Sequence, residues 1–552
     1  MNEPLWQDYH KHTSLSNVYT KDSPLIHLDY WNELKARYGD KPCAYTTVEH
    51  GWAGNYFKTY DDLEKFNKKN GTNIKFVFGY EAYWVKDRHT DDKSNCHMIL
   101  LARNDNGRKA LNKILSIANK DGYYYRPRLD LELIMSLPPD DVMLTTACIA
   151  YWNKYQDIDD ITAQFASKFP YFYLEVQPHH TQTQADLNRH ILELSSQLNV
   201  PIIAGCDSHV IFESQMKDRD DLLESAHITY EDEDGWFMDF PTYDVLFSRF
   251  QQQGVLSDEQ IKQAIDNTNV LMDFEDIVLD RSLKVPVVKS LRDKTRQERN
   301  DEFERIVWSE WERQKWDINE AKHDEYIEEI NDAINEIEAC NMADYFITTY
   351  YTMKEGQEKY GGILTPSGRG SAVSMYLNKI LQFTKVDKVN SPVEMYPERF
   401  LTKERVLESH VPPDIDHNVS DRQPFIKAQR ELVGELGTYD LLALGTLKTK
   451  AAWKMYARAN SIDPQIANKV SYQIGDYEQA KKHADNPDDI NIEDFIAPEF
   501  KELFEECKKY LGIYDSRKGH PCATICYDGD AEADIGVILC KSEATGNEVL
   551  TA

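Results

Sequence analysis

The sequence predicts an α/β protein of several domains, and three observations indicate this. Over roughly the first 275 residues, short apolar runs rich in β-branched and aromatic residues alternate with helical runs. From Leu291 to about Ala343 the sequence is helical and heavily charged, with apolar residues three or four positions apart. Around residues 447–512 a smaller group of helices is expected. The 552 residues suffice for three or four domains with a large core.

The N-terminal alternation predicts a sheet covered by helices. VMLTTACIA, YFYLEVQ and PIIAGCDSHV are expected strands, and the helical runs ITAQFASKFP and TQADLNRHILELSSQLN separate them. Repeated βα units favour a parallel sheet, either open or closed into a barrel. We expect this domain to span residues 1–275, because the alternation is lost there.

Composition and charge exclude several classes of protein. Charged residues are 28% and hydrophobic residues 41%, as in an ordinary globular protein. The net charge of −31 excludes a generally basic nucleic-acid coat protein, but it is compatible with a local basic groove. No apolar run predicts a membrane span or a secretory signal. Nine scattered cysteines without a CxxC pair favour a reducing cytoplasm over a disulfide scaffold.

Metal-binding side chains recur at the ends of the expected strands. The carboxyl ends of strands in a βα architecture converge on one face, where active-site residues usually lie. Imidazole, carboxylate and thiolate are ligands of Zn, Mn or Fe. The strand-end candidates are His10, His12, His50, Glu81, Cys148, Asp207 and His209. Each alone is weak evidence, and an isolated HxH pair is more often structural, but their repeated placement at strand ends favours a metal centre.

The order of these motifs resembles the PHP (polymerase and histidinol phosphatase) domain of C-family bacterial DNA polymerases, the DNA polymerase III alpha subunits. The matching segments are HKHTSLS, VEHGWAG, GYEAYW, CHMILLARN, TTACIAYW and CDSHV. The resemblance implies a distorted (βα)₇ barrel with up to three Zn, Mn or Fe ions. It assigns nine ligands: His10, His12, Asp22, His50, Glu81, His97, Cys148, Asp207 and His209. It further implies metal-dependent 3′→5′ exonuclease proofreading, and the alternative is a metal-stabilised domain that only braces a polymerase.

A second group of motifs has the character of a phosphate site. In PSGRGSAVS, the backbone of Gly370, the Ser371 hydroxyl and the Arg369 guanidinium are able to contact phosphate. In VPPDIDHN, Asp414 and Asp416 would share one side of a strand and could bridge two Mg²⁺ ions. A lone DxD is more often an acidic strand end, so the pair needs support from its surroundings.

A basic stretch follows in GTLKTKAAWK. Lys448 and Lys450 occupy an expected turn before a helix, where they would meet triphosphate or primer backbone, unless they simply start a solvated helix. Because the chain is acidic overall, DNA would approach through a local basic channel. The expected channel residues are Lys448, Lys450, Lys454 and Arg458.

The order GRGSA, YPERFLTKER, PDID and GTLKTKA resembles the palm of the same polymerase family, which is of the Pol β nucleotidyltransferase type. The resemblance implies that Asp414 and Asp416 bind Mg²⁺ and act in catalysis. It also implies a nucleotide-binding set made of Arg369, Gly370, Ser371, Arg399 and Lys448. Primer-template DNA, deoxynucleoside triphosphates and other replisome proteins would be the partners.

The resemblance also predicts how the chain is divided. The expected parts are a PHP domain at 1–275, a first part of the palm at 276–446, a helical thumb at 447–512 and a truncated continuation of the palm at 513–552. In the family, the third catalytic acid lies some distance beyond a segment like HPCATICYD, within a K-[FY]-D strand. The sequence stops before any such motif. We therefore expect no primer extension by this chain alone, and a C-terminal polymerase half as a partner.

Two other functions remain open at the level of sequence. A stand-alone PHP phosphoesterase would explain the first 275 residues or so but leaves GRGSA, PDID and GTLKTKA without a purpose. A non-catalytic fragment that binds DNA or a partner polypeptide would show binding without turnover.

Overall fold

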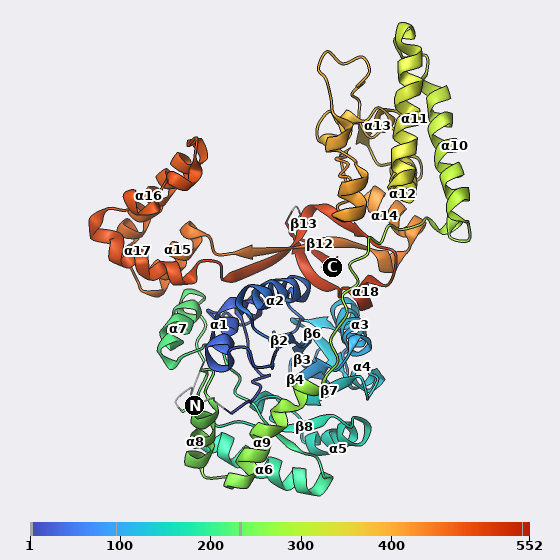
Figure 1. The fold of residues 1–552 in the computed structure, drawn as a ribbon. Helices are drawn as coiled ribbons and strands as arrows, with labels where there is room; N and C mark the ends of the chain where they lie inside the picture. The colour runs from blue at the N-terminus through green and yellow to red at the C-terminus, as the bar shows by residue number, and fades with distance from the viewer. Residues whose placement is uncertain (1–3, 95, 231–234, 544) are drawn as a thin grey trace. The chain divides into compact units, whose positions relative to one another are not determined.

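The computed structural model describes residues 4–94, 96–230, 235–543 and 545–552. The chain divides into two compact units. Unit 1 comprises Met1–Leu279, Leu442–Gly519 and Ile535–Thr551, and unit 2 comprises Asp280–Leu441, His520–Asp534 and Ala552. Both units contain helices and strands, so the predicted α/β class is confirmed (Figure 1).

In the first 279 residues of unit 1, helices and short strands alternate as predicted. The strands are β1 (Cys43–Tyr45), β2 (Ile74–Phe76), β3 (Gly79–Val85), β4 (Cys96–Ala102), β5 (Tyr123–Tyr124), β6 (Arg126–Asp130), β7 (Val142–Thr145), β8 (Phe172–Val176) and β9 (Ile202–Ala204). The α-helices are α1 (His27–Tyr38), α2 (Tyr56–Asn70), α3 (Asp105–Asp121), α4 (Leu131–Ser136), α5 (Ile158–Lys168), α6 (Gln182–Leu198), α7 (Met216–Ser225), α8 (Tyr243–Gln253) and α9 (Asp258–Asp266). The helices lie around the strands (Figure 1).

The main sheet has seven strands in the order β5-β6-β3-β4-β7-β8-β9. Its pairs β3–β6, β7–β8 and β8–β9 are parallel, as the repeated βα units predicted. The expectation of a wholly parallel sheet is wrong, because β4 runs antiparallel to both β3 and β7. The connection 86–95 between β3 and β4 is shorter than the dozen or so residues that a parallel crossover requires, so the chain has to turn straight back.

Backbone hydrogen bonds outside the named strands extend this sheet at the residues that follow β9 and β1. The N–H of His12 donates to Ser208 (2.9 Å) and the N–H of Val48 donates to Lys11 (2.9 Å). Glu81 in β3 in turn accepts from Gly51 (2.8 Å). The pairing therefore passes from the end of β9, through residues 8–12 and 48–51, to β3.

The largest core of unit 1 fills the space between this sheet and its helices. Leu100, Leu144 and Leu174 of three neighbouring strands are each 0% exposed. The helices begin and end with ordinary caps: Asn104 accepts from the N–H of Gly107 at the start of α3, and Gly71 in a left-handed conformation ends α2 as predicted.

The remaining part of unit 1 contains the predicted group of helices and all or part of four strands. The helices are α15 (Thr449–Ala459), α16 (Pro464–His483) and α17 (Lys501–Cys507). The strands are β12 (Thr438–Thr446), β13 (Tyr514–Cys526), β14 (Ile538–Ser542) and β15 (Glu548–Thr551), which form a closed barrel and of which β12 begins in unit 2. Within unit 1, β13 pairs parallel to β14, and β14 pairs antiparallel to β15.

Unit 2 is mainly helical. Its α-helices are α10 (Arg296–Gln314), α11 (His323–Ala339), α12 (Ala343–Glu358), α13 (Leu377–Ile380), α14 (Gln423–Val433) and α18 (Ala531–Asp534), with a small sheet of β10 (Leu364–Thr365) and β11 (Asn418–Val419). Helices α10 and α11 confirm the helical prediction for residues 291–343. Phe303, Ile330 and Phe346 from α10, α11 and α12 share one core. Figure 1 shows these three helices next to one another.

Two further expectations concern membrane-spanning segments and disulfides. No described helix is both long and apolar enough to cross a bilayer. All nine cysteines are free thiols, in agreement with the absence of a predicted disulfide scaffold.

Truncating the central strand β7 should destabilise unit 1. For Leu144→Ala we expect a loss of about 2–5 kcal/mol in the free energy of unfolding, because Leu144 is 0% exposed and its removal leaves a cavity. Leu28→Ala on α1, where the leucine is 44% exposed, should change it by no more than about 0.5 kcal/mol. Urea unfolding followed by circular dichroism measures both, and equal midpoints for the two variants would contradict the core assignment.

Candidate functional site

The nine predicted metal ligands come from separate segments of unit 1 that the sheet brings to one place. Glu81 lies in β3 and His97 in β4. Cys148 follows β7, and both Asp207 and His209 follow β9. The other four lie in segments before α1 or after β1, namely His10, His12, Asp22 and His50. Seven of the nine are buried, and His97 and Asp207 are partly exposed.

Glu81 lies at the middle of the cluster. One of its oxygens, Oε1, is 2.9 Å from Nδ1 of His97 and 3.6 Å from Nε2 of His10. The other, Oε2, is 2.9 Å from Nδ1 of His50 and 3.4 Å from Nε2 of His12. A single carboxylate that is 1% exposed therefore faces four imidazoles from three segments.

Asp207 joins the remaining residues to this group. Its Oδ1 lies 3.0 Å from Nε2 of His12, 3.2 Å from Nε2 of His10 and 3.8 Å from Nδ1 of His209. His209 in turn lies 3.3 Å from Asp22 through its Nε2 atom.

Cys148 is connected on the opposite side, with its Sγ 3.5 Å from Nδ1 of His97. The structure thus brings all nine predicted ligands into one continuous cluster.

Three overlapping groups within the cluster have the spacing of metal ligands. In each, one ligand atom per residue lies within 4.8 Å of the others. The groups are His12, His50 and His209; His10, His12 and Asp207; and His50, Glu81 and His97. The ring of His12 is close to those of both His50 (4.3 Å between centroids) and His209 (4.6 Å).

Several polar atoms of the cluster are buried and lack a hydrogen-bond partner of suitable geometry among the described residues. They are Nε2 of His10, Nδ1 of His50, both carboxylate oxygens of Glu81 and Nε2 of His209. Unsatisfied buried polar groups cost free energy, so their concentration at one point requires an explanation. A divalent cation would satisfy them, and the set of imidazole, carboxylate and thiolate ligands fits Zn, Mn or Fe.

The protonation states of the cluster reflect the mutual attraction of these groups. Burial alone would raise the pKa of Glu81, but His97, His50 and His10 hold it well below its usual range. Against its own burial, His97 has its pKa raised to about 10 by Glu81 and Cys148. Burial, with His50 and His209 beside it, lowers the pKa of His12 to about 3, so this imidazole is neutral, as metal binding requires.

Two buried glutamates that the sequence analysis missed support the cluster. Glu175 of β8 lies 2.6 Å from Nδ1 of His10 through Oε1, and Tyr9 donates to its Oε2 (2.5 Å). Glu49 accepts from Ser16 Oγ (2.6 Å), which lies 3.2 Å from Nδ1 of His12. A carboxylate behind a metal-binding histidine orients the ring and raises its basicity. The signal for Glu175 was an acid inside the otherwise apolar strand YFYLEVQ.

The backbone beside the cluster is strained at three non-glycine residues. Positive φ values occur at Lys21 (62°), Ala147 (48°) and Asp207 (52°), next to or at Asp22, Cys148 and Asp207. Such conformations cost free energy and are enriched at functional sites.

The two motifs of the predicted nucleotide site lie side by side in unit 2. A Cβ atom on Gly370, whose φ is +79°, would lie 2.6 Å from Oδ2 of Asp416. The strands β10 and β11, which lie just before GRGSA and just after PDID, pair antiparallel through Leu364 and Val419. The expectation that Asp414 and Asp416 lie on a strand is wrong, because within the described chain β11 begins only at Asn418.

The basic residues of the predicted nucleotide site are exposed. Arg369 precedes Gly370, and Arg399 ends the short turn Pro397–Arg399. That turn contacts the turn Ser371–Ser374, which begins at the predicted phosphate-binding serine. Arg369, Gly370, Ser371, Arg399 and the two aspartates therefore share one region of unit 2.

The predicted DNA-binding residues lie on α15 in unit 1. Lys448 is its N-terminal cap residue, and Lys454 and Arg458 are exposed one and two turns beyond Lys450. The opposite face of the helix, with Trp453 and Tyr456, is buried. Arg458 also donates to the carbonyl of Ser225 (3.0 Å), so part of its role is to hold α15 against α7.

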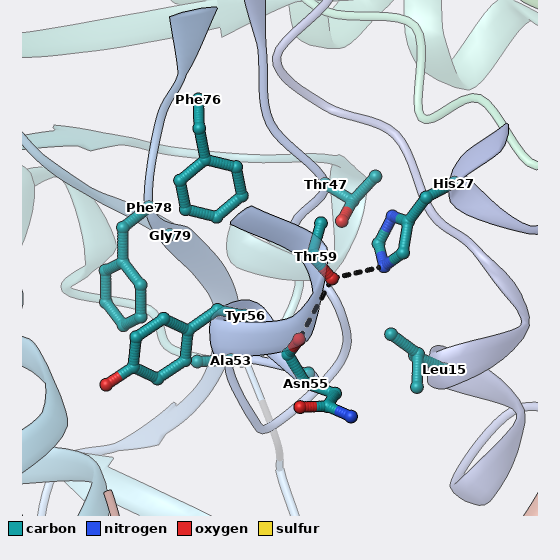
Figure 2. A pocket seen from close by; sticks show the side chains of 11 residues that line it. Leu15, His27, Thr47, Ala53, Asn55, Tyr56, Thr59, Phe76, Phe78 and Gly79 are labelled. Carbon is teal, nitrogen blue, oxygen red and sulfur yellow. Dashed lines mark hydrogen bonds between the residues drawn. The ribbon is translucent and has the colours of Figure 1, made fainter. Parts of the chain in front are cut away.

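Another polar pocket in unit 1 has no comparable chemistry. It is lined by Leu15, His27, Asn55, Thr59 and other residues, and its volume is about 10 Å³. Thr59 Oγ1 lies 2.9 Å from Nε2 of His27 and donates to the carbonyl of Asn55 (Figure 2). Such a volume holds at most about one water molecule, so His27 is a structural histidine.

Two family models match the chain. Residues 44–179 match the PHP domain, and residues 296–549 match the bacterial DNA polymerase III alpha NTPase domain. The first range includes His50, Glu81, His97 and Cys148, and the second includes GRGSA and PDID. The second match argues against a stand-alone PHP phosphoesterase.

Curated relatives cover both regions. The DNA polymerase III subunit alpha of Aquifex aeolicus is 26% identical over 86% of this chain and 44% of its own length. That of Borreliella burgdorferi is 25% identical over 78% of this chain and 37% of its own length. A protein of Bacillus subtilis named probable DNA polymerase YorL is 21% identical over 84% of this chain and 41% of its own length.

The chain thus spans less than half the length of the curated relatives described here. Its two matched domains follow one another in the order expected from the sequence motifs. The chain thus matches the PHP domain and the bacterial DNA polymerase III alpha NTPase domain, and it is similar across both to DNA polymerase III alpha subunits.

Proposed function

We propose that the PHP cluster binds up to three divalent cations and hydrolyses the phosphodiester at the 3′ end of a DNA strand. The observation that carries this proposal is the buried group of imidazole, carboxylate and thiolate atoms centred on Glu81. In such a centre, clustered cations activate water and stabilise charge on phosphate. The activity would be 3′→5′ exonuclease proofreading.

The roles of the side chains follow from their positions. His10, His12, Asp22, His50, Glu81, His97, Cys148, Asp207 and His209 would hold the cations. Glu175 would fix the ring and the protonated nitrogen of His10, because its carboxylate faces Nδ1 and leaves Nε2 directed at Asp207 and Glu81. Ser16 and Glu49 would do the same for His12.

We also propose that the second site takes part in template-directed nucleotidyl transfer within a Pol β-type palm. Asp414 and Asp416 would bind Mg²⁺, the Gly370–Ser371 backbone and hydroxyl would hold triphosphate, and Arg369, Arg399 and Lys448 would neutralise it. Lys450, Lys454 and Arg458 would contact the DNA backbone, with residues 447–512 as a thumb.

The contact between Gly370 and Asp416 supports this reading, since it joins the phosphate loop to the metal pair. Primer-template DNA, deoxynucleoside triphosphates and replisome proteins in the cytoplasm are the proposed partners.

Removing one central ligand should abolish the nuclease. For His12→Ala we expect the rate of nucleotide release from labelled single-stranded DNA to fall by more than about 100-fold, which exceeds the loss usual for a supporting residue. The assay is run with Mn²⁺, Zn²⁺ or Fe²⁺ added. His190→Ala on α6, where the side chain is 42% exposed, is the matched control and should retain the rate. Equal residual rates in His12→Ala and the unmodified chain would refute the nuclease.

Removing the negative charge behind His10 should weaken metal binding without removing a ligand. For Glu175→Gln we expect a 10- to 100-fold weaker affinity for Zn²⁺, measured by competition with a coloured chelator. Glu193→Gln on the exposed side of α6 serves as the control and should leave the affinity unchanged. An unchanged affinity in Glu175→Gln would show that Glu175 has only a packing role.

A methyl group at Gly370 should impair nucleotide binding through Asp416. Both Gly370 (φ +79°, ψ 177°) and Gly361 (φ +69°) have a positive φ that favours glycine, so alanine strains the backbone at either position, by about 1–3 kcal/mol at Gly370. A Cβ at Gly361 would meet nothing within 4 Å, whereas at Gly370 it would displace the Asp416 carboxylate. We expect Gly370→Ala, and not Gly361→Ala, to weaken Mg²⁺-dependent binding of a deoxynucleoside triphosphate by at least about 10-fold in calorimetry, on the scale of one lost charge-assisted contact. Equal binding by both variants would contradict the proposed site.

A further inference from the structure

Unit 1 contains a second cavity, of about 320 Å³, that none of the motifs accounts for. This volume is in the range of small-ligand sites. Its lining comes from three segments of unit 1: the turn after the histidine motif, the strands β5 and β6, and the strands β13, β14 and β15. The lining residues that matter here are Tyr19, Tyr123, Arg126, Arg517 and Lys541.

Two arginines and a tyrosine form the wall of this cavity. The guanidinium carbon of Arg126 lies 4.8 Å from the ring centre of Tyr19, and that of Arg517 lies 4.5 Å from the same ring. Arg126 donates to the Tyr19 carbonyl (3.2 Å), and Arg517 donates to the Tyr19 hydroxyl. The two cations are thus fixed against one aromatic ring, and the half-buried Tyr123 adds a second ring to the lining.

Arg517 has donor capacity that the protein does not use. Its Nη1 atom is buried and has no hydrogen-bond partner among the described residues. A buried cationic N–H group without an acceptor is costly, whereas a phosphate oxygen would satisfy it with a charge-assisted bond. This unsatisfied donor indicates an anionic ligand.

The acidic residues of the lining do not cancel this charge. The two acids are Asp515 and Glu548, against the three cations Arg126, Arg517 and Lys541. Asp515 is already paired with Lys21 (2.9 Å), so Glu548 alone is set against the three cations and the lining keeps an excess of positive charge. Both guanidinium groups therefore remain available for an anion.

A single side chain separates the cavity from the metal cluster. The ring of Tyr83 lies 5.3 Å from that of His97 and 6.0 Å from that of His50. On its other side the same ring lies 6.0 Å from Tyr19 and 5.6 Å from the guanidinium of Arg126.

We propose that this cavity binds a nucleotide of the single DNA strand whose end is cleaved at the metal cluster. Arg517, Arg126 and Lys541 would contact phosphate, while Tyr123 and Tyr19 supply faces on which a base stacks. Aromatic rings beside a positive groove are the usual means of holding single strands without sequence preference. This inference rests on the proposed nuclease, because the substrate of that site determines which strand enters.

Binding to the metal-free full-length chain tests the cavity separately from the nuclease. The probe is a fluorescent oligothymidylate of about eight nucleotides, within the usual size of a single-strand site, in the presence of EDTA. For Tyr123→Ala we expect about 5- to 100-fold weaker binding, the loss usual for one stacked base. For Lys541→Gln and Arg517→Gln the slope of log affinity against log salt should fall by about 0.7 for each lost phosphate contact. Arg189→Gln, an exposed arginine on α6, is the control.

Arg517 also packs on Trp52 (5.2 Å), so a loss of binding in Arg517→Gln has two causes to separate, the lost phosphate contact and lowered stability. Lys541 is exposed, and its substitution leaves the packing of Arg517 on Trp52 intact. If Arg517→Gln has a lowered melting temperature, Lys541→Gln and Tyr123→Ala therefore decide whether the cavity binds the strand. Unchanged binding in both refutes the cavity as a strand site, and so does tighter binding of thymidine monophosphate than of the oligonucleotide. If His12→Ala still binds the oligonucleotide without metal and the cavity variants do not, the cavity is supported as a strand site even where the nuclease activity is absent.

Discussion

The structure of unit 1 depends on the burial of carboxylates that need compensating positive charge. Glu81 is 1% exposed and Asp207 is held among His10, His12 and His209. An isolated carboxylate in such surroundings would cost several kcal/mol or take up a proton. The chain avoids this by bringing histidines from distant segments to the same two carboxylates. The arrangement of the sheet therefore determines which residues make up the cluster.

The antiparallel strand β4 contributes to this arrangement. Antiparallel pairing places His97 directly opposite Tyr83, and Glu81 lies two residues earlier on the same face of β3. His97 is therefore next to the carboxylate, and Tyr83 lies beside both. The backbone N–H groups of His12 and Val48 donate to the carbonyls of Ser208 and Lys11, and these bonds bring the N-terminal histidines to the same carboxylate. The strained φ of Asp207 is tolerated because these bonds fix its neighbours.

Much of this could be predicted from the sequence, and what could not has physical reasons. Strand ends carrying His10, His12, Asp207 and His209 were visible, because alternation and turn residues are local signals. The direction of β4 could not be predicted from such local signals, because it depends on the length of the connection between β3 and β4. Glu175 and Glu49 were missed because a supporting carboxylate has no characteristic spacing from the histidine it orients. The pattern around Asp414 predicts a strand where the described chain has none before Asn418, because alternation along the sequence does not determine whether a segment pairs with another.

The two proposed sites differ in how far the protein alone organises them. The histidines and carboxylates of the first are buried and held by one another, by Glu175 and by Glu49, so little conformational freedom is left to lose on binding. In the second, Asp414, Arg369 and Arg399 are exposed, and neither aspartate carboxylate has a hydrogen bond or ion pair to another described residue. Ordering long exposed side chains costs free energy, which binding of nucleotide and Mg²⁺ has to supply. Affinity at the first site therefore reflects a geometry formed on folding, whereas affinity at the second reflects the ligands that assemble it.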